Sequence, residues 1–506
     1  MLKSCFKRLP ILLLTVLLLL PVSGEVSGQN MQGYYPGDWV SYTTTRFATS
    51  VAIGWSDIYF GTMGGIIQYN SVEKKWRNPI TKSDGLPSSD IWRIAVNRAN
   101  DVIWVETPLG VYSYNPVFQH WYFESDFPDE LVTSRIDAPE YLQPYILDVG
   151  YNLTYEDNYA VITDPQLRSY RVIDAIEDDW DHIWLATYGQ GIARVDQSSG
   201  YVTLIPFGLY QDNINTVLID GTDVWFGGKP DESTENAITV WRRDESQWEY
   251  FEATYMDWIV SDYVNDIVAD KSHVYFATDF GLVKYRKSRN TFTSYTRALG
   301  LRSTAIQSLY LEDSLLFMGG DGVIDVLLTT RDSIFPLQTS IPAIGTVLSM
   351  SHIGSNFWVG TDYGVHRFDE VEFKWSRYNV PSGYLGGAVW QFAEGDDGDV
   401  WFAGIDGVVH VDKNLLELET FLTRHELGNS VPHRIAFTDD FLWIGTDKGL
   451  YRYEDSNDRW KQYTVYEGLI SDYVNDMVLE GDYLWIATPE GVTRFYWNND
   501  KRIRDD

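Results

Sequence analysis

The stretch Tyr466–Phe495, YEGLISDYVNDMVLEGDYLWIATPEGVTRF, contains three short apolar runs separated by polar turns. By simple alternation, Val474, Asp476 and Val478 share one face of the first run, as do Leu484, Ile486 and Thr488 in the second. This period of two is typical of β-strands with one buried face. Three such strands cannot bury their apolar side chains alone, so the stretch requires neighbours of the same kind.

The rest of the chain supplies those neighbours as repeats. Residues 259–267, IVSDYVNDI, nearly repeat residues 469–477, LISDYVNDM, at an offset of 210 residues. A signature of an aromatic or large apolar residue, an apolar residue, a small residue and Thr or Gly recurs about every 42 residues. We assign ten copies, which begin at Tyr59, Trp104, Trp184, Trp225, Tyr275, Leu316, Trp358, Trp401, Trp443 and Trp485. Short strands with a Trp in each unit at this period predict the blades of a β-propeller.

Small residues follow the signature aromatic by two positions in most units, as at Gly227, Gly360 and Gly445. We expect neighbouring sheets to approach closely at these positions. Glu106 and Met318 depart from the rule. The sequence therefore predicts irregular packing in the second and sixth blades.

The first strand-like segment, Trp39–Tyr42, has the pattern that ends later units, for example Trp460–Tyr463. It precedes any inner strand, whereas the last unit stops near Phe495 without an outer strand. We therefore expect Trp39–Tyr42 to complete the last blade, which removes exposed strand edges. The prediction is an all-β fold, a single large β-propeller of about ten four-stranded blades over residues 38–499, followed by a polar tail at 500–506.

One insertion interrupts the repeats at Glu124–Tyr170, where Trp104 and Trp184 stand 80 residues apart. It is either a long loop with its own hairpin or a degenerate eleventh blade. We favour the loop because the segment lacks the signature, and loops of this length are often functional.

The N-terminus has the pattern of a signal peptide over residues 1–24. Basic residues precede the apolar run Leu9–Leu20, and Val22-Ser23-Gly24 offers a small-residue cleavage site. A leader loop at 25–37 follows. Cys5, the single cysteine, falls inside the signal peptide. These features predict a secreted or periplasmic protein without disulfides.

The composition narrows the choice of partners. The net charge of −33 disfavours binding to nucleic acid and to anionic lipid. No downstream segment is apolar and long enough for a membrane helix, so we expect no membrane insertion.

Residues 442–477, LWIGTDKGLYRYEDSNDRWKQYTVYEGLISDYVNDM, resemble the two-component-regulator propeller repeat. That repeat has a Trp-Ile-Gly-Thr strand, a Gly-Leu strand and then Gly-Leu-x-Ser/Asn before the next inner strand. The resemblance implies the ligand-binding sensor region of a histidine kinase system, often one that responds to glycan fragments. The chain has no kinase or receiver segment, so a separate signalling partner would have to carry any signal.

Propeller topology places the loop that precedes each inner strand (the leading loop) and the turn after each signature strand (the signature turn) at one mouth. Aromatic residues there can stack on sugar rings, and carboxylates can accept hydroxyl hydrogen bonds. Capping of turns by Asp and packing by Tyr is the alternative explanation for any single residue. The candidate ligand-binding residues are Asp90, Trp92, Asp262, Tyr263, Asp472, Tyr473, Asp279, Asp362 and Asp447. In a ten-blade ring Asp262 and Asp472 would face each other across the axis, which suits an oligomeric glycan or a protein loop.

Metal and catalytic sites find little support in the sequence. The acidic stretches Glu177–Asp181 and Glu394–Asp399 lack calcium-loop spacing and are better explained as turns. No HExxH, G-x-S-x-G or phosphate-binding glycine loop occurs, so we predict no catalytic residues, no metal and no cofactor.

The sequence therefore favours a non-catalytic binding propeller that holds a glycan fragment or a partner protein. Two alternatives stay open: a structural or assembly partner of an envelope or secretion complex, and a propeller-type lyase or hydrolase. An enzyme would show a carboxylate or His of perturbed pKa in the axial channel, whereas an assembly partner would show an outer apolar patch.

We predict that the mature chain begins near Glu25, because Val22 and Gly24 occupy the small-residue positions of a signal-peptidase site. N-terminal sequencing of exported protein checks this cleavage. A membrane-held product that retains Leu9–Leu20 would contradict it.

Overall fold

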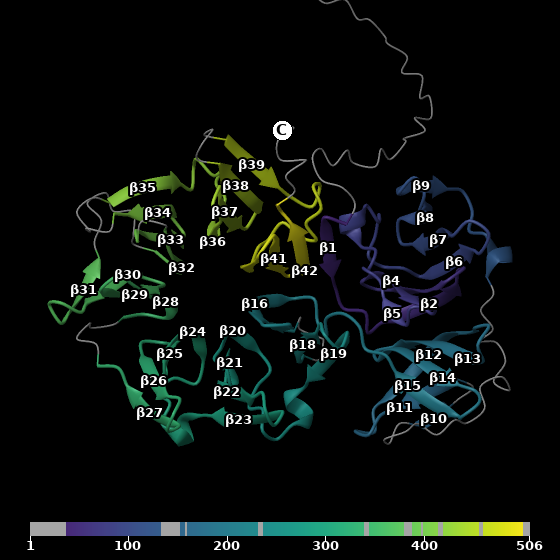
Figure 1. Cartoon of the computed structure of the whole chain (residues 1–506), viewed down its shortest axis with the longest axis horizontal. Coiled ribbons are helices and arrows are strands. Elements are labelled where there is room, and N and C mark those ends of the chain that lie inside the picture. Colours follow the sequence, from purple (N-terminus) through teal and green to yellow (C-terminus); the bar gives the residue numbers. More distant parts are fainter. Residues whose placement is uncertain are drawn as a thin grey trace, which may run out of the picture.

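The computed structural model describes residues 37–132, 152–156, 159–230, 236–338, 344–378, 387–395, 398–412, 418–454 and 459–498. The expected signal peptide, nearly all of the leader loop and the polar tail lie outside these residues. The regular structure is a series of β-strands with four short 3₁₀ segments, Lys82–Asp84, Asp129–Leu131, Ala253–Tyr255 and Arg297–Leu299. The prediction of an all-β propeller of four-stranded sheets is confirmed (Figure 1).

The strands form ten sheets, which we number as blades 1–10 in chain order. Blades 1 to 3 contain β2 (Ala48–Ile53), β3 (Asp57–Thr62), β4 (Gly65–Asn70) and β5 (Lys75–Trp76); β6 (Arg93–Asn97), β7 (Val102–Thr107), β8 (Gly110–Asn115) and β9 (His120–Glu124); and β12 (Ser169–Glu177), β13 (His182–Tyr188), β14 (Gly191–Asp196) and β15 (Tyr201–Leu204). Blades 4 to 6 contain β16 (Ile214–Asp220), β17 (Asp223–Gly228), β18 (Ile238–Arg242) and β19 (Gln247–Phe251); β20 (Val264–Ala269), β21 (His273–Thr278), β22 (Gly281–Arg286) and β23 (Thr291–Tyr295); and β24 (Ile306–Glu312), β25 (Leu315–Gly320), β26 (Ile324–Leu328) and β27 (Ser333–Pro336).

Blades 7 to 9 contain β28 (Val347–Ile353), β29 (Asn356–Thr361), β30 (Gly364–Asp369) and β31 (Lys374–Tyr378); β32 (Val389–Glu394), β33 (Val400–Gly404), β34 (Gly407–Val411) and β35 (Leu418–Thr423); and β36 (Pro432–Phe437), β37 (Phe441–Thr446), β38 (Gly449–Glu454) and β39 (Arg459–Tyr463). Blade 10 contains β40 (Asp476–Glu480), β41 (Tyr483–Thr488), β42 (Gly491–Tyr496) and β1 (Trp39–Tyr42).

Seven of these sheets, blades 4–10, close into a ring. Each inner strand packs against the next, and β40 of blade 10 packs against β16 of blade 4. The Asn475 side chain donates to the carbonyl of Ile214 at 2.7 Å, and the Val217 N–H donates to Asp476 at 3.0 Å. The prediction that all ten blades share one ring is therefore wrong: the ring closes after seven.

The other three sheets form an open arc beside the ring (Figure 1). The inner strand of blade 1 packs against that of blade 2 on one side and that of blade 3 on the other. Asp174 of blade 3 accepts a 2.9 Å hydrogen bond from the Val51 N–H of blade 1. Strands β10 (Asn152–Glu156) and β11 (Tyr159–Thr163), from the stretch where the insertion was expected, form a hairpin that extends blade 3 to six strands.

The arc is inserted into the ring at a single point. The chain leaves after β1 through residues 43–47 and returns through residues 207–210, which run alongside it. The Leu209 N–H donates to the carbonyl of Thr43 at 3.0 Å, and the Thr44 hydroxyl donates to the carbonyl of Tyr210 at 3.1 Å. Because the two ends meet, the arc interrupts the chain between blade 10 and blade 4 without opening the ring.

The small residues of the signature allow neighbouring blades to approach. A Cβ on Gly360 would lie 2.7 Å from the Val389 carbonyl oxygen, and one on Gly445 would lie 2.5 Å from a methyl of Val474. Both distances are too short for real atoms. Val389 begins the inner strand of the next blade, and Val474 lies just before that of blade 10, so the close approach expected from the sequence is present.

The two departures from the small-residue rule, at Glu106 and Met318, have different causes. Ser308 pairs with Gly319 as Ser349 pairs with Gly360, so Gly319 is the small residue of blade 6 and Phe317 is its signature residue. The assignment of Leu316 and Met318 to these roles was wrong by one residue. Glu106 does occupy the small position, because it pairs with Arg93 at the start of β6. Blade 2 ends the arc, and among the described strands none packs on its far side as β6 packs on β2.

The N-terminal strand completes blade 10 as predicted. Trp39–Tyr42 pairs with Val492–Phe495 in antiparallel register, and the Trp39 ring stacks on Phe495 with centroids 3.8 Å apart. Trp39 is only 2% exposed. The equivalent residue of blade 9, Trp460, is 40% exposed and stacks on Tyr453.

Trp39→Ala is therefore expected to lower the free energy of unfolding by about 3–5 kcal/mol, since it empties a filled core position. Trp460→Ala is the matched control, and it should cost about 1 kcal/mol or less because its ring already contacts water. Denaturant unfolding of both variants measures the difference. Equal losses would contradict closure of the ring by β1.

Candidate functional site

The leading loops and the signature turns of the ring lie together at one mouth. The Asp279 N–H donates to the carbonyl of Tyr263 at 3.3 Å, and the Asp447 N–H donates to the carbonyl of Val431 at 3.2 Å. In blade 7 the Asp362 N–H reaches the carbonyl of Thr346 at the same distance of 3.2 Å. The mouth is therefore a layered rim in which each signature turn is fastened to the loop beside it.

A Thr-Asp-x-Gly sequence builds each of these turns. In blade 7 the Thr361 hydroxyl donates to the carbonyl of Gly364 at 3.0 Å and accepts from the Tyr363 N–H at 3.1 Å. Gly364 has φ of +115°, a conformation that disfavours a side chain. The residue between Asp and Gly is consequently left at the tip of the turn, pointing away from the sheet.

The predicted carboxylates of the ring are engaged by the protein itself. Asp362 accepts from the Thr346 N–H at 2.9 Å, Asp447 from the Val431 N–H at 2.7 Å and Asp472 from the Val465 N–H at 2.7 Å. Asp279 accepts from Asn265 at 2.9 Å. These side chains shape the loops that form the rim.

Asp262 is the most enclosed of the predicted carboxylates. It accepts a 2.8 Å hydrogen bond from the Ala253 N–H, and burial raises the pKa of its carboxyl. Its role in the structure is to hold the loop that precedes blade 5.

The predicted aromatic residues of the ring remain available to solvent. Tyr263 is 38% exposed and Tyr473 is 42% exposed. At the tips of signature turns the exposed side chains are Phe280, Tyr363 and Ile405, which the sequence reasoning missed. For Phe280 and Tyr363 the signal that could have found them is their place between Asp and Gly in the turn, whereas Ile405 lies between Gly404 and Asp406.

A row of three rings crosses blades 8, 9 and 10 at this mouth. Trp390 and His433 meet edge to face with centroids 5.0 Å apart, and His433 meets Tyr473 at 4.9 Å. His433 faces the carbonyl of Val474 with Nδ1 at 3.1 Å and the Tyr473 hydroxyl with Nε2 at 3.4 Å. Burial lowers the pKa of His433, which favours the neutral ring.

Trp390 and His433 were also missed by the sequence reasoning. They stand at the position that Asn265 and Asn475 occupy in the blades with the repeated VND sequence. Because that position points toward the next blade at the mouth, an aromatic side chain there was the signal for a row of rings.

Two predicted residues do not belong to the ring. Asp90 and Trp92 precede β6 of the arc, where Trp92 is 54% exposed and its N–H donates to the carbonyl of Glu106 at 2.8 Å. The expected placement of Asp262 opposite Asp472 is also wrong. They belong to blades 5 and 10, which only blade 4 separates in the ring of seven.

The inner strands carry one carboxyl with a strongly changed pKa. Burial, with a further contribution from the charge of Asp476, raises the pKa of Asp266 to about 7. Both oxygens of Asp266 accept backbone hydrogen bonds, from the Leu309 N–H at 2.7 Å and the Ile267 N–H at 2.8 Å. Asp476 joins blade 10 to blade 4 in the same way, so joining blades explains Asp266 without a catalytic role.

The described residues contain no group of three His, Cys, Asp or Glu side chains placed to hold a metal ion. In the acidic stretch 177–181, Asp178 accepts from the indole of Trp184 at 2.8 Å and from the His182 N–H at 3.0 Å. Residues 396 and 397 of the second acidic stretch lie outside the described residues. Within those residues, none of the helical segments has the length and hydrophobicity to cross a membrane.

Solved propeller structures share this architecture. One is the extracellular domain of a protein assigned to the hybrid two component systems of B. thetaiotaomicron, with 15% identity, coverage of 90% of this chain and 69% of that chain, and a TM-score of 0.50. Another is PorZ, described as a surface component of the type-IX secretion system of Porphyromonas gingivalis, with 15% identity, the same coverage and a TM-score of 0.47. The first supports the resemblance at the level of the fold. No protein-family model and no curated protein matches the sequence.

Because of Asp266, we expect the stability of the ring to depend on pH. Its pKa in the folded chain is above the ordinary value of 3.8, so the folded state binds the proton more tightly than the unfolded state. This contribution to stability is complete below about pH 4 and is lost as the pH rises toward 7.

We therefore expect the melting temperature of Asp266→Asn, relative to the wild type, to increase as the pH rises from 4 to 7. Asn215→Ala removes an uncharged inner-strand contact, the 2.9 Å bond to the Val264 carbonyl, and should shift the melting temperature by an amount independent of pH. A constant offset for Asp266→Asn would contradict the assignment.

Proposed function

We propose that this chain is a non-catalytic, extracytoplasmic binding propeller that holds an oligosaccharide at the aromatic mouth of its seven-blade ring. The observation that carries the proposal is the ring row Trp390–His433–Tyr473, which crosses three neighbouring blades at this mouth with His433 buried between two partly exposed rings. Tyr263 of blade 5 and Tyr363 of blade 7 add exposed rings on other parts of the rim. Aromatic faces at this spacing suit successive pyranose rings, which have apolar faces and polar edges.

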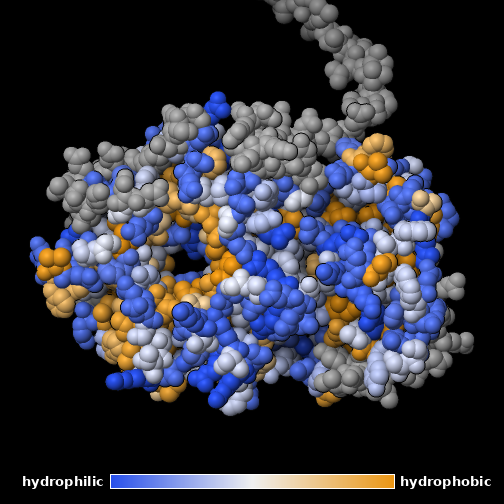
Figure 2. Space-filling model, viewed as in Figure 1, coloured by the Kyte–Doolittle hydropathy of each residue, from blue (hydrophilic) through white to orange (hydrophobic). Residues whose placement is uncertain are grey.

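The shape of the molecule supports a ligand that extends over several blades. Figure 2 shows an opening within the ring with hydrophobic side chains on its rim. The exposed rings belong to separate blades, so a single small sugar cannot contact all of them. The carboxylates of the rim are bound to backbone N–H groups, and we assign them the task of fixing the loops that present the rings.

An extracytoplasmic location agrees with the sequence pattern of residues 1–24 and with the extracellular placement of the structural neighbour from B. thetaiotaomicron. Catalysis is not part of the proposal because Asp266, the inner-strand carboxyl whose pKa is raised, is committed to the contact between blades 5 and 6. Signal transfer would pass through a separate protein.

A glycan screen with the purified chain should identify an oligosaccharide ligand. Tyr473→Ala and Tyr263→Ala are then each expected to weaken binding by about 1–3 kcal/mol, roughly 5- to 150-fold in Kd, because each removes a stacking face. Tyr483→Ala is the matched control, since Tyr483 begins β41 at the opposite end of blade 10. Isothermal titration calorimetry gives the three affinities.

Two results would redirect the proposal. Wild-type affinity in both mouth variants would place the glycan elsewhere on the molecule. Absence of any glycan ligand, together with capture of a protein that depends on Tyr263 and Tyr473, would favour the mouth as a site for a partner protein.

A further inference from the structure

The interface between blades 6 and 7 differs from the others at its signature residue. Of the ten signature residues, seven are Trp and two are Tyr, and the tenth is Phe317. The indoles of Trp225, Trp358, Trp443 and Trp485 are fully buried against the next blade. Phe317 is smaller than an indole and carries no N–H or O–H donor.

In blades 5 and 10 a carboxylate receives the donor of the signature residue, whereas the indoles of Trp225, Trp358 and Trp443 have no hydrogen-bond partner. The Trp485 indole donates to Glu480 at 2.9 Å, and the Tyr275 hydroxyl donates to Asp270 at 2.9 Å. Each acid stands five residues before its aromatic partner. Blade 6 keeps the acid at this spacing, because Glu312 pairs with Leu315 just as Glu480 pairs with Tyr483. Blade 6 therefore keeps the acceptor that blades 5 and 10 use, and its signature residue supplies no donor.

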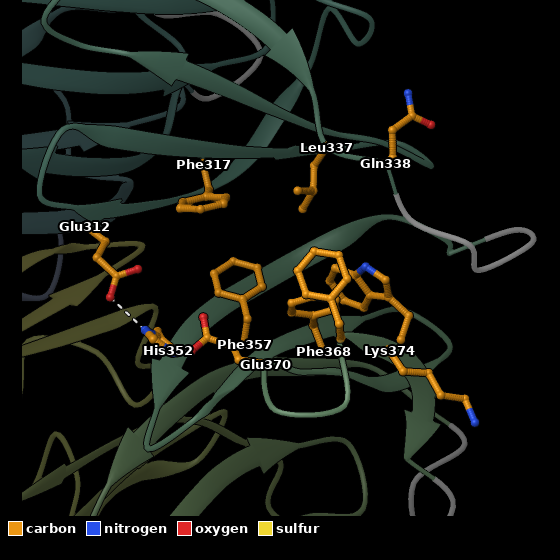
Figure 3. Close-up of a pocket in the computed structure, with 11 residues that line it drawn as sticks. Glu312, Phe317, Leu337, Gln338, His352, Phe357, Phe368, Glu370 and Lys374 are labelled. Carbon is orange, nitrogen blue, oxygen red and sulfur yellow. Dashed lines mark hydrogen bonds and ion pairs between the residues drawn. The ribbon is translucent and has the colours of Figure 1, made fainter.

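A cavity of about 670 Å³ occupies this position (Figure 3). Phe317 and Leu337 of blade 6 line one wall, and Phe357 and Phe368 of blade 7 line the other. Trp375 also lines the cavity. Phe357 packs on Phe317 with centroids 4.8 Å apart, yet its ring fills only part of the space. A volume of this size is in the range of small-molecule sites.

At its polar end the cavity has one histidine that contacts two glutamates. His352 Nδ1 forms a 2.7 Å hydrogen bond with Oε1 of Glu312. Its other ring nitrogen, Nε2, lies 3.5 Å from a carboxylate oxygen of Glu370. The two carboxylates raise the pKa of His352, and its bond to Glu312 fixes the direction of that side chain. Glu312 has a second carboxylate oxygen for an incoming donor, and both acids disfavour an anionic ligand.

We propose that this cavity, which lies outside the aromatic mouth, binds a planar aromatic ring that carries an N–H donor, of the indole class. The ring lies between Phe317, Phe357 and Phe368, and its N–H donates to Glu312 as the chain's own indole does to Glu480 in blade 10. Such a ring can come from a free small molecule or from a tryptophan side chain of another polypeptide.

The full mature chain is titrated with indole, with 1-methylindole and with a blocked Gly-Trp-Gly peptide, using ligand-observed NMR and calorimetry. Indole is expected to bind, and 1-methylindole, which lacks the N–H, should bind at least tenfold more weakly. Tighter binding of the peptide than of indole identifies a polypeptide source, whereas tighter binding of indole identifies a free ligand. Absence of indole binding at millimolar concentration, or equal affinity for indole and 1-methylindole, overturns the proposal.

Two variants test the site itself. Phe317→Trp places the chain's own indole in the cavity, so it should reduce indole affinity at least tenfold and raise the melting temperature. Phe335→Trp is the matched control on the same blade, outside the cavity, and should bind indole as the wild type does. Glu312→Ala should make the affinities for indole and 1-methylindole equal, and this result decides the matter if Phe317→Trp does not fold. Unchanged indole binding by folded Phe317→Trp would place the ligand elsewhere and overturn the proposal.

Discussion

The contact between blade 10 and blade 4 is the constraint on which the architecture depends. Asn475 and Asp476 bind the backbone of β16 on one side of the ring, and Asn265 and Asp266 bind the backbone of β24 on another. The same three letters, VND, therefore make the same joint twice. Because one of these joints spans 261 residues of sequence, it decides that the ring has seven blades and that the first three sheets must lie outside it. The strand β1 then completes blade 10 before the chain leaves to build the arc.

The sequence predicts the individual blades well, but it does not predict which blades lie next to one another. Strand patterns, the signature aromatic residue, the small residue and the outer strand supplied by Trp39–Tyr42 all follow from local alternation and period. Which blade touches which depends on contacts between residues far apart, and a regular period is equally compatible with ten blades or seven. One residue did carry the missing information. Glu106 stands where a small side chain is needed against a following blade, and blade 2 has no such follower in the described structure.

The candidate site was predictable in its location and less so in its chemistry. Topology alone places the leading loops and signature turns together, and the backbone hydrogen bonds between them bear this out. Asp362 and Asp447 look like ligands in a sequence, since carboxylates at a mouth are common in binding sites. Their hydrogen bonds to the backbone N–H groups of the neighbouring loops show that turn formation uses the same side chains. Trp390 and His433 escaped notice because their arrangement in one row depends on the packing of three blades, which no single repeat reveals.

In a repeat protein the informative residues are those that break the repeat. Each unit must fill the same space against its neighbour, so a substitution at a shared position leaves a specific and describable gap. Glu106 replaces a small residue where no blade follows among the described strands, and Phe317 replaces the Trp or Tyr of the other blades while Glu312 keeps the position that Glu480 has in blade 10. The first departure marks the end of a stack of sheets and the second marks an unfilled cavity between two of them. Blades 5 and 10 show which kind of donor an acid at this position accepts, and this comparison is the basis of the ligand chemistry proposed for the cavity beside Glu312.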